Sequence, residues 1–387
     1  MSNHTRRDLL RTGAIGAGAL LAGCTGNSST ETADAGDEST STSEETATAT
    51  PEDTSYSVEM APVGSVEFEE PPQKVAHYFP GYADMAVALG HGDTVASIGT
   101  PSRYYTSYYD ELPGVSVDKD SITDLIGESG IDKEIFYELD ADLHMIDPVW
   151  LTSNDFFGLE QKDIEELTTN VAPFLGNSIF RRTDTWHDYR FYTLYEAFEK
   201  VAQVHQEQEK YQQFKGFHDA FLADVQTKLP PADSRPSALL VYGAGDEPES
   251  FSPYRISDKG TNKKQFHDLG ITDALAGTGI EGLSESNRGK IDYETMLEVD
   301  PEVILMRAHE TKTEQEFQDT VVAFMKEHPT AKELTAVQND QVFRGGPIYA
   351  GPIHNLFLTE RFATGLFPDH FEGELFDRDE LAGIITG

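Results

Sequence analysis

Short apolar runs alternate with amphipathic stretches along most of the chain, and this pattern is typical of an α/β fold. Residues 74–79 (KVAHYF) and 94–100 (TVASIGT) predict strands, and residues 81–90 between them predict a helix. A strand, a helix and a second strand in this order predict a parallel sheet. The plan returns in the second half of the chain, where 237–243 and 302–306 predict strands. We therefore expect two α/β lobes, each with a mainly parallel sheet flanked by helices.

An apolar stripe with helical spacing lies between the two lobes. It includes Phe191, Phe214 and Val225 and predicts a helix over about 189–229, roughly 60 Å long if it is unbroken. The polar run 206–210 interrupts the stripe and leaves a bend at that point open. A helix lacks the loop residues that absorb large dihedral changes. We therefore expect one long backbone helix to join the lobes, and the cleft between them to move little.

An acidic phrase occurs twice in the chain. DKEIFYELDADLHMID begins at Asp132, and DYETMLEVDPEVILMR begins at Asp292. The two copies agree at four acidic positions, which include Glu134 and Glu294, and each copy then enters an apolar run. The repeat indicates that the two lobes are related in structure.

The N-terminal residues have the features of an export signal. TRRDLLR is a twin-arginine motif, and LLAGC resembles a lipobox, whose Cys24 would become the lipidated N-terminus. The residues that follow, to about 57, are mostly Ser, Thr, Ala, Asp and Glu, and they predict a flexible tether. We expect the protein at the extracellular face of the cell membrane, in contact with the membrane through its lipid anchor only. The expected domains are the signal 1–23, the lipidated tether 24–57, an N-terminal lobe 58–186, an interlobe helix 187–230 and a C-terminal lobe 231–387.

The net charge of the chain limits the kinds of partner that it can bind. Asp and Glu number 68 against 29 Lys and Arg, a formal charge of −39, which excludes nucleic acid because phosphate binding needs a basic face. Since molar salt screens the repulsion among so many carboxylates, we expect a halophilic source. Cys24 is the only cysteine, so no disulfide or thiolate metal site can form within one chain.

Candidate ligand residues follow the predicted strands, because open α/β sheets bind ligands at the carboxyl ends of their strands. Arginine is scarce in this chain, so its presence at such positions supports the assignment. The segment 103–110 (RYYTSYYD) fits neither a strand nor a helix face and predicts a wall or lid of the cleft. The candidates are Tyr78, Tyr82, Arg103, Tyr104, Tyr105, Trp150, Arg181, Arg182, Trp186, Tyr242, Arg307, His309 and Tyr349, and more widely Phe79, Phe251, Tyr254, Arg255 and His354.

The chain carries no recognisable catalytic constellation. It has no HExxH, no GxSxG, no P-loop and no cysteine nucleophile. The GTGIEG segment at 277–282 matches a dinucleotide pattern but follows no predicted strand. The histidines are scattered without ligand-like pair spacing, which argues against a site for a bare divalent metal. We expect recognition without turnover, with no enzymatic activity, no metal site and no cofactor.

In their order and spacing, these segments resemble the solute-binding proteins of ABC importers that have a rigid helical backbone, the class that serves ferric siderophores, haem and cobalamin. The resemblance covers about 74–371 and includes KVAHYFPGYADMAVALG, the two acidic phrases, and AVQNDQVFR followed by LFPDHF. It implies a monomer that captures a bulky Fe(III)-siderophore chelate in the cleft, for which guanidinium donors and aromatic faces are suited. Haem and cobalamin remain alternatives.

The same resemblance gives the acidic repeat a role. In the family, one glutamate of each copy, seven positions before a proline, docks on the permease, and Glu134 and Glu294 match it. The first copy has Ala141 in place of the proline. A permease dimer with two-fold symmetry needs a near-symmetric partner, which a repeated carboxylate supplies. Arg288 matches a position where relatives often place a ligand-facing Arg or Trp, but its counterpart in the first copy is the acidic Glu128.

Overall fold

The computed structural model describes residues 55–387 except 129 and 285. The signal 1–23, Cys24 and nearly all of the tether 24–57 lie outside the described residues. Strand β1 (Tyr56–Met60) begins inside the segment that we expected to be tether, and it pairs with β2 (Gly64–Phe68) in an antiparallel hairpin. None of the helices in the described part of the chain is long and apolar enough to cross a membrane.

The N-terminal lobe is built on a four-stranded parallel sheet. Its strands lie in the order β5-β4-β3-β6, and helix α1 connects β3 to β4. Three further helices, α2, α3 and α4, cover the lobe. The bounds are β3 Val75–His77, α1 Pro80–Ala88, β4 Val95–Ile98, β5 Thr123–Asp124, α2 Glu134–Leu139, β6 Leu143–Met145, α3 Pro148–Ser153 and α4 Gln161–Asn170.

The C-terminal lobe has a mixed, mainly parallel sheet. Its order is β11-β10-β7-β8, in which β8 is antiparallel to β7 and the short β9 pairs with the start of β7. The helices α8 to α11 bury a separate core that includes Leu239, Met306 and Phe317. The two-lobe α/β class is therefore confirmed. The bounds are β7 Ser237–Tyr242, β8 Ser252–Tyr254, α7 Lys264–Asp268, β9 Thr272–Asp273, α8 Tyr293–Val299, β10 Val303–Arg307, α9 Glu314–Phe317, α10 Ala323–Glu327, α11 Thr335–Gln338 and β11 Val342–Arg344.

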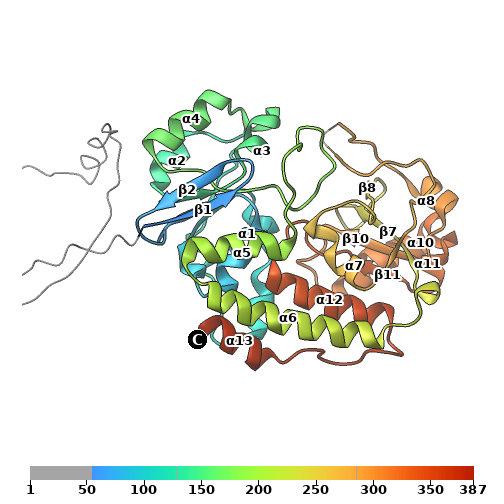
Figure 1. Cartoon of the computed structure of the whole chain (residues 1–387). Helices are drawn as coiled ribbons and strands as arrows, with labels where there is room; N and C mark the ends of the chain where they lie inside the picture. The colour runs from blue at the N-terminus through green and yellow to red at the C-terminus, as the bar shows by residue number, and fades with distance from the viewer. Residues whose placement is uncertain (1–54, 129, 285) are drawn as a thin grey trace, which may run out of the picture. The chain divides into compact units, whose positions relative to one another are not determined.

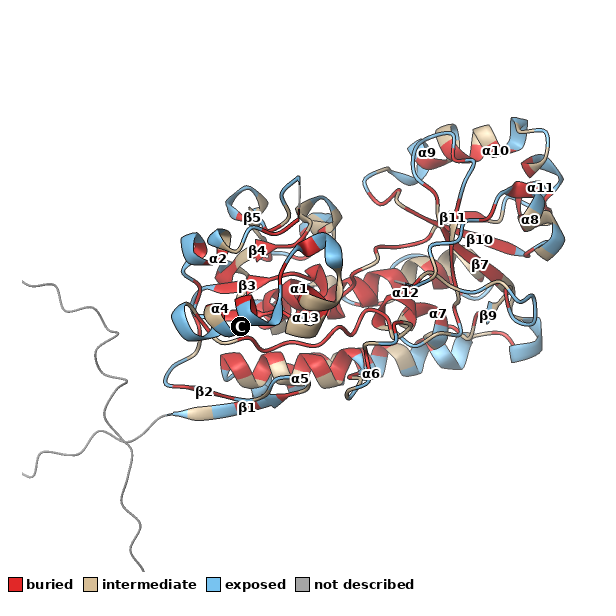
Figure 2. Ribbon diagram, turned by 90° about the horizontal axis from the view of Figure 1, so that it is seen from above, coloured by how far each residue is buried: buried red, intermediate tan, exposed pale blue. Residues whose placement is uncertain are grey.

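The expected single interlobe helix, 187–230, is in fact two helices. Helix α5 (Leu194–His205) ends at Gln206, whose φ of 58° is left-handed, and α6 (Gln208–Lys228) follows at once. Phe198 and Phe214 would lie about 24 Å apart along one straight helix. Their rings are 5.4 Å apart, so α6 folds back along α5. The expectation of one long helix over about 189–229 was thus wrong, and the chain turns back at the point where the sequence leaves a bend open. Of the two helices, α6 is the one that runs beneath both lobes (Figures 1 and 2).

Helix α12 (Pro352–Leu366) also connects the lobes. It packs on α1 of the N-terminal lobe and on α7 of the C-terminal lobe. The last helix, α13 (Arg378–Thr386), packs along α6, and Lys210 of α6 donates to the Ile385 carbonyl. The expected C-terminal lobe, 231–387, therefore ends in a segment that is shared between the lobes, because the surface that α12 buries comes from both of them.

A buried carboxylate fixes the start of α12. Asp84 of α1 accepts hydrogen bonds from the Tyr109 hydroxyl at 2.7 Å and from the backbone N–H groups of Ile353 and His354 at 2.9 and 3.3 Å. These N–H groups belong to the first turn of α12 and have no partner within the helix. Burial raises the pKa of Asp84, and the donors around it partly offset this.

A second buried carboxylate, Glu310, contacts a later part of α12 through Arg361. Arg361 donates to both of its oxygens at 2.8 and 3.2 Å, Tyr108 donates at 3.2 Å, and the Gly346 N–H donates at 2.9 Å. Burial alone would raise the pKa of Glu310, but Arg361 outweighs it and the net direction is down. We call the groups of Asp84 and Glu310 with their donors the interlobe clasp, because each joins residues of both lobes.

The clasp corrects our interpretation of the tyrosine-rich segment 103–110. Tyr108 and Tyr109 donate to the clasp carboxylates, and Tyr104 is buried with its hydroxyl 3.1 Å from that of Tyr109. The Tyr108 ring lies 5.4 Å from Phe357 of α12. The tyrosines of 103–110 are spaced unevenly because they form a contact between the lobes. The segment does not form a lid.

Candidate ligand-binding cleft

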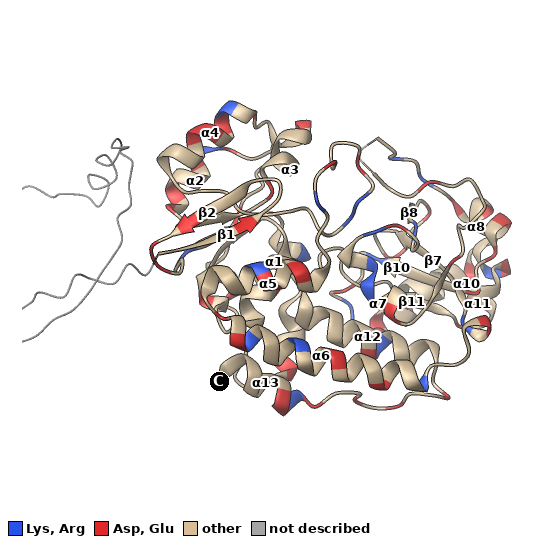
Figure 3. Cartoon of the chain, in the orientation of Figure 1, with Lys and Arg blue, Asp and Glu red and all other residues tan. Residues whose placement is uncertain are grey.

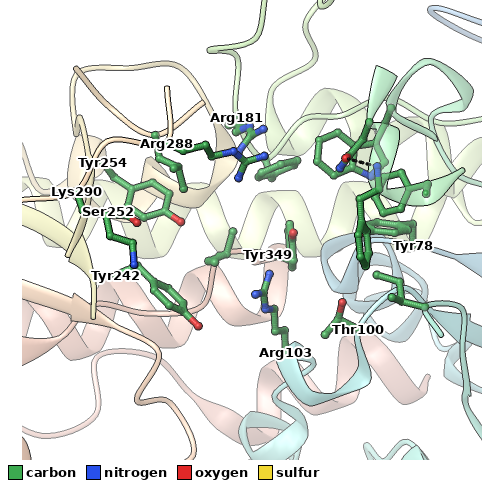
Figure 4. Close-up of a pocket in the computed structure, with 18 residues that line it drawn as sticks. Tyr78, Thr100, Arg103, Arg181, Tyr242, Ser252, Tyr254, Arg288, Lys290 and Tyr349 are labelled. Atoms are coloured by element: carbon green, nitrogen blue, oxygen red, sulfur yellow. Dashed lines mark hydrogen bonds between the residues drawn. The ribbon is translucent and has the colours of Figure 1, made fainter. Parts of the chain in front are cut away.

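A cavity of about 500 Å³ lies between the lobes, at the carboxyl ends of the strands (Figure 4). The N-terminal lobe contributes residues that follow β3, β4, β5 and β6, and the C-terminal lobe contributes residues of β7 and β8 and of the loop after β11. The crossing segment from the first lobe adds two more. The lining consists of Tyr78, Thr100, Arg103, Ile126, Trp150, Asn154, Phe156, Phe157, Phe180, Arg181, Tyr242, Ser252, Tyr254, Leu283, Arg288, Lys290, Ile348 and Tyr349.

The lining is basic, although the chain as a whole is strongly acidic. It contains four cationic side chains, Arg103, Arg181, Arg288 and Lys290, and no Asp or Glu among the described residues. Figure 3 shows, by contrast, Asp and Glu along the outer helices α4, α6 and α13. Cations gathered in one cleft attract an anion more strongly than the same charges spread over an open surface.

Arg181 is the only one of the four cations with a carboxylate partner in the described part of the chain. It binds Asp184 through two parallel contacts, Nε to Oδ2 at 2.7 Å and Nη2 to Oδ1 at 3.2 Å. Its guanidinium also lies 5.2 Å from the Phe180 ring and 5.6 Å from the Trp150 ring. This pair compensates the charge of Arg181 and fixes its orientation, because a bidentate contact permits one geometry. The other three cations leave the lining with a net positive charge.

The cations lie on different sides of the cavity. Figure 4 shows Arg181 and Arg288 on one side, Arg103 on the opposite side, and Tyr349 between them. Arg103 follows β4 in a short 3₁₀ turn. A ligand in the cavity would therefore contact positive charge from several directions.

Aromatic side chains form the wall on the N-terminal lobe. Trp150 lies 5.9 Å from Tyr78, 5.6 Å from Phe157 and 5.6 Å from Phe180, all at steep ring angles. Tyr349 of the other lobe continues this wall, 5.0 Å from Phe180. Edge-to-face packing of this kind holds rings in place and leaves their faces available to a ligand.

The tyrosine hydroxyls of this wall are neutral. Burial raises the pKa of Tyr78 and of Tyr349 above the ordinary value. A neutral phenol donates a hydrogen bond but is a poor iron ligand. No group of three or more His, Cys, Asp and Glu residues that could hold a metal ion occurs among the described residues. The cleft thus offers cations and neutral hydrogen-bond donors to a bound anion.

Half of the fourteen predicted ligand residues line this cavity. Their common feature is a position directly after a strand, or in the crossing segment, with a side chain that reaches the interlobe space. They are Tyr78, Arg103, Trp150, Arg181, Tyr242, Arg288 and Tyr349.

The tyrosines among the other seven candidates point elsewhere. Tyr82 is buried in α1 and donates to the Asn177 carbonyl at 2.9 Å, and Tyr104 is buried beside the clasp. The Tyr105 carbonyl accepts from His354 at 2.9 Å, and its ring does not line the cavity. A residue that follows a strand can thus turn into the protein, and the sequence does not show which way it turns.

The remaining four candidates are also outside the lining. Arg307 is fully buried at the end of β10, where it donates to the Asn262 carbonyl and lies 4.7 Å from the ring of Tyr254. Arg182 lies over the Tyr189 ring at 5.2 Å. Trp186 stacks on His187 at 4.7 Å, and His309 contacts the Gly243 carbonyl at 2.7 Å.

The sequence interpretation missed several lining residues. Lys290 lies two positions beyond Arg288, so the spacing of alternate side chains in an extended segment could have indicated it. Phe156 and Phe157 follow α3 in a 3₁₀ turn, and Phe156 is 53% exposed. An exposed phenylalanine beside the cavity has no signal in the sequence, because apolar residues are normally assigned to the core.

Glu134 and Glu294 occupy equivalent places in the two lobes. Each is exposed in the first turn of its helix, α2 or α8, and each helix ends at an aspartate in the left-handed region, Asp140 with φ 44° and Asp300 with φ 42°. Figure 1 shows α2 and α8 in the upper half of the molecule, one on each lobe. The structural repeat is therefore real, and the Glu134 and Glu294 carboxylates are accessible.

Comparisons with known proteins give a consistent result. A family model described as periplasmic binding protein matches residues 75–349. Among solved structures, the chain is similar to the iron-uptake substrate-binding protein PiuA of Streptococcus pneumoniae, with 14% identity, a TM-score of 0.55, and 80% of this chain and 98% of that chain covered. It is also similar to the petrobactin-binding protein YclQ of Bacillus subtilis, with 16% identity, a TM-score of 0.56, and 81% and 99% covered. A third similar structure is the haem-binding protein HmuT, with 16% identity, a TM-score of 0.53, and 80% and 89% covered. A comparison with curated proteins finds no match.

Proposed function

Because the chain belongs to the periplasmic binding protein family, we propose that it is the solute-binding component of an ABC importer and that its cleft captures an anionic Fe(III)-siderophore chelate. The observation that carries the proposal is the charge of the cleft. Three cationic side chains without a carboxylate partner in the described part of the chain, Arg103, Arg288 and Lys290, line a cavity of about 500 Å³ in a chain of net charge −39.

Arg103 is half-buried, and Arg288 and Lys290 are exposed, so an anion that enters the cavity can reach all three cations. The described lining supplies no carboxylate to neutralise them, so we infer that the ligand brings the negative charge. The aromatic wall of Trp150, Phe157 and Tyr349 adds flat, apolar contact area. A ferric chelate with several anionic oxygens and aromatic or apolar arms combines both properties, and its iron needs no ligand from the protein.

The proteins of similar structure support this choice in part. PiuA serves iron uptake and YclQ binds petrobactin. HmuT binds haem, and haem or cobalamin remains the alternative for the same fold. The lining does not favour haem, because it contains no histidine among the described residues and Tyr78 and Tyr349 are neutral. Its positive charge does not favour a neutral macrocycle such as cobalamin. A bare divalent metal ion is disfavoured because the described residues contain no group of three or more His, Cys, Asp and Glu that could hold it.

The ligand can be identified by titration of the protein in molar salt. Trp150 lines the cavity and Trp186 packs against it at 5.9 Å, so bound chelate should quench tryptophan fluorescence. We expect ferric tricatecholates, with charge −3, to bind at least about tenfold more tightly than neutral ferric hydroxamates. Tighter binding of haemin or cobalamin, or no binding of any chelate, would contradict the proposal.

Delivery to the permease is the second part of the proposal. We assign docking to the Glu134 and Glu294 carboxylates, with Cys24 as the lipid anchor that keeps the protein at the extracellular face of the cell membrane. Reversing both charges, Glu134→Arg with Glu294→Arg, should abolish uptake of the chelate by cells and leave its affinity unchanged. The matched control is Glu138→Arg with Glu298→Arg, since these exposed residues occupy the same two helices. If both double variants lose uptake equally, the overall surface charge of the lobes matters for uptake and the Glu134 and Glu294 carboxylates have no specific role.

A further inference from the structure

A second cavity, of about 410 Å³, lies on the interlobe helices and shares no lining residue with the cleft. It is bounded by the start of α5, the middle of α6, the loop 259–261 and helix α7. Cavities of this volume are typical of small-molecule sites. Nothing in the proposed capture of a chelate uses it.

The fold builds this cavity through a close contact between two chain segments. The Arg182 N–H donates to the Lys259 carbonyl at 3.1 Å, and the Thr261 N–H donates to the Ile179 carbonyl at 3.0 Å. Gly260 between them has φ 147°, and a Cβ there would lie 2.3 Å from the Phe180 carbonyl oxygen. Glycine is therefore required, and the loop that bounds the second cavity is fixed in place.

The polar groups of the cavity form an ordered chain. The Lys264 ammonium donates to Asp268 at 2.6 Å and to His218 Nε2 at 3.3 Å. His218 must then carry its proton on Nδ1, which donates to Asp219 at 3.0 Å. Burial, followed by the charge of Lys264, lowers the pKa of His218 to about 4, so its ring is neutral at pH 7. Lys215 pairs with Asp219.

One polar group at this cavity, the Tyr195 hydroxyl, has no hydrogen-bond partner among the described residues. The Tyr195 hydroxyl is buried and makes no hydrogen bond to any described residue, although its ring lines the cavity and lies 4.2 Å from the ring of His218. Burial, and then the carboxylates of Asp268 and Asp219, raise its pKa well above the ordinary value, so it is a donor. An unsatisfied buried hydroxyl costs about 1–3 kcal/mol unless something accepts its hydrogen bond.

The donors decide the class of the missing partner. Lys264 uses two of its three N–H groups on Asp268 and His218, which leaves one, and Lys259 adds an ammonium without an ion pair among the described residues. Both acids are already paired with lysines. Phe191 and the Tyr195 ring provide flat apolar surface beside these donors. We propose that this cavity is a second ligand site for a small organic acid with a flat apolar body. The carboxylate of the acid would accept hydrogen bonds from Tyr195 and Lys264, and its apolar body would pack on the rings of Phe191 and Tyr195.

The test is a titration of the full chain with the probe 4-fluorobenzoate in molar salt, in which ¹⁹F NMR measures binding. Saturable binding is expected, and 4-fluorobenzylammonium, which has the opposite charge, should bind at least about tenfold more weakly. Tyr195→Phe removes only the hydroxyl and should weaken benzoate binding about fivefold. Lys264→Gln should weaken it about tenfold.

Two control variants make the result specific. Lys228 pairs with Asp224 on α6 at the same spacing as Lys215 and Asp219 but lies outside the cavity, so Lys228→Gln should leave the affinity unchanged. Arg288→Gln alters only the cleft and should also leave it unchanged. Loss of binding in Arg288→Gln would place the probe in the cleft and overturn the proposal. The absence of saturable binding would also overturn the proposal. So would an unchanged benzoate affinity in both Tyr195→Phe and Lys264→Gln. If Lys264→Gln fails to fold by circular dichroism, Tyr195→Phe decides alone, since its ring packing is unchanged.

Discussion

The cleft and the interlobe clasp both place charged side chains between the lobes, but they treat charge in opposite ways. In the clasp, Asp84 and Glu310 are buried and each accepts at least three hydrogen bonds from the protein. In the cleft, Arg103, Arg288 and Lys290 have no carboxylate partner among the described residues. A group that the protein satisfies itself serves the fold, whereas a group left unsatisfied is available to a ligand.

The clasp also leads us to expect little hinge motion between the lobes. It joins α1, α12 and the tyrosine-rich segment, and α6 runs beneath both lobes. Opening the cleft widely would expose the Asp84 and Glu310 carboxylates or separate them from their donors. The cleft residues can thus be preorganised, which reduces the entropy that ligand binding must overcome.

The largest expected effect comes from breaking the clasp. Asp84→Ala removes the acceptor of Tyr109 and of two N–H groups of α12, and it should lower the free energy of unfolding by about 3 kcal/mol or more because these donors stay buried. Urea unfolding at fixed salt measures it. The exposed Asp110→Ala in the same segment should change it by less than about 0.5 kcal/mol. Similar losses in the two variants would show that the clasp has no special role.

The next effect concerns the cleft cations. Arg103→Gln with Arg288→Gln should weaken binding of a ferric tricatecholate about 100-fold, about 1.4 kcal/mol for each lost charge, and should change binding of a neutral hydroxamate less than about threefold. Fluorescence titration gives both values. Arg190→Gln, at an exposed ion pair outside the cleft, is the matched control. Equal weakening for both chelates would mean that shape, and not charge, is recognised.

His144 is a third case, because a buried titratable group that stays neutral needs no charged partner. His144 in β6 is fully buried and makes no side-chain hydrogen bond among the described residues, and burial lowers its pKa from the ordinary 6.5 to about 3. Between these values the unfolded chain binds a proton that the folded chain does not. The stability that His144 contributes is therefore present above pH 6.5 and is lost as the pH falls toward 3.

Replacement of this histidine should flatten the pH dependence. His144→Leu should reduce the loss of unfolding free energy between pH 7 and pH 5 by about 2 kcal/mol relative to the unmodified chain. Denaturant unfolding at the two pH values tests this. His370→Leu, which replaces an exposed histidine, is the matched control. An unaltered slope in His144→Leu would show that this ring is protonated in the folded protein.

The smallest expected effect is at the mouth of the cleft. Phe156 is 53% exposed and lies 5.9 Å from Phe157, so Phe156→Ala should weaken chelate binding about threefold through lost contact area alone. The same titration measures it, and stability should not change. A loss beyond about tenfold would assign Phe156 a central place in recognition.

Much of the architecture follows from local pattern. The strands at 75–77, 95–98, 237–242 and 303–307 lie within or beside the predicted ones, because short apolar runs bounded by turns have few alternatives. The helix between 189 and 229 was harder to predict. Its stripe continues on both sides of Gln206, but periodicity does not distinguish a straight helix from two helices that pack on each other.

The sequence by itself determined that this protein has two related α/β lobes, an acidic phrase in each, and scarce arginines placed after strands. Only the tertiary structure decided which arginines reach the cleft. Arg103 follows β4 and turns into the cavity, whereas Arg307 ends β10 and is buried against Asn262 and Tyr254. Both positions look alike along the chain. The direction of each side chain depends on partners that are distant in sequence, and it is those partners that separate a charge held for a ligand from one held by the fold.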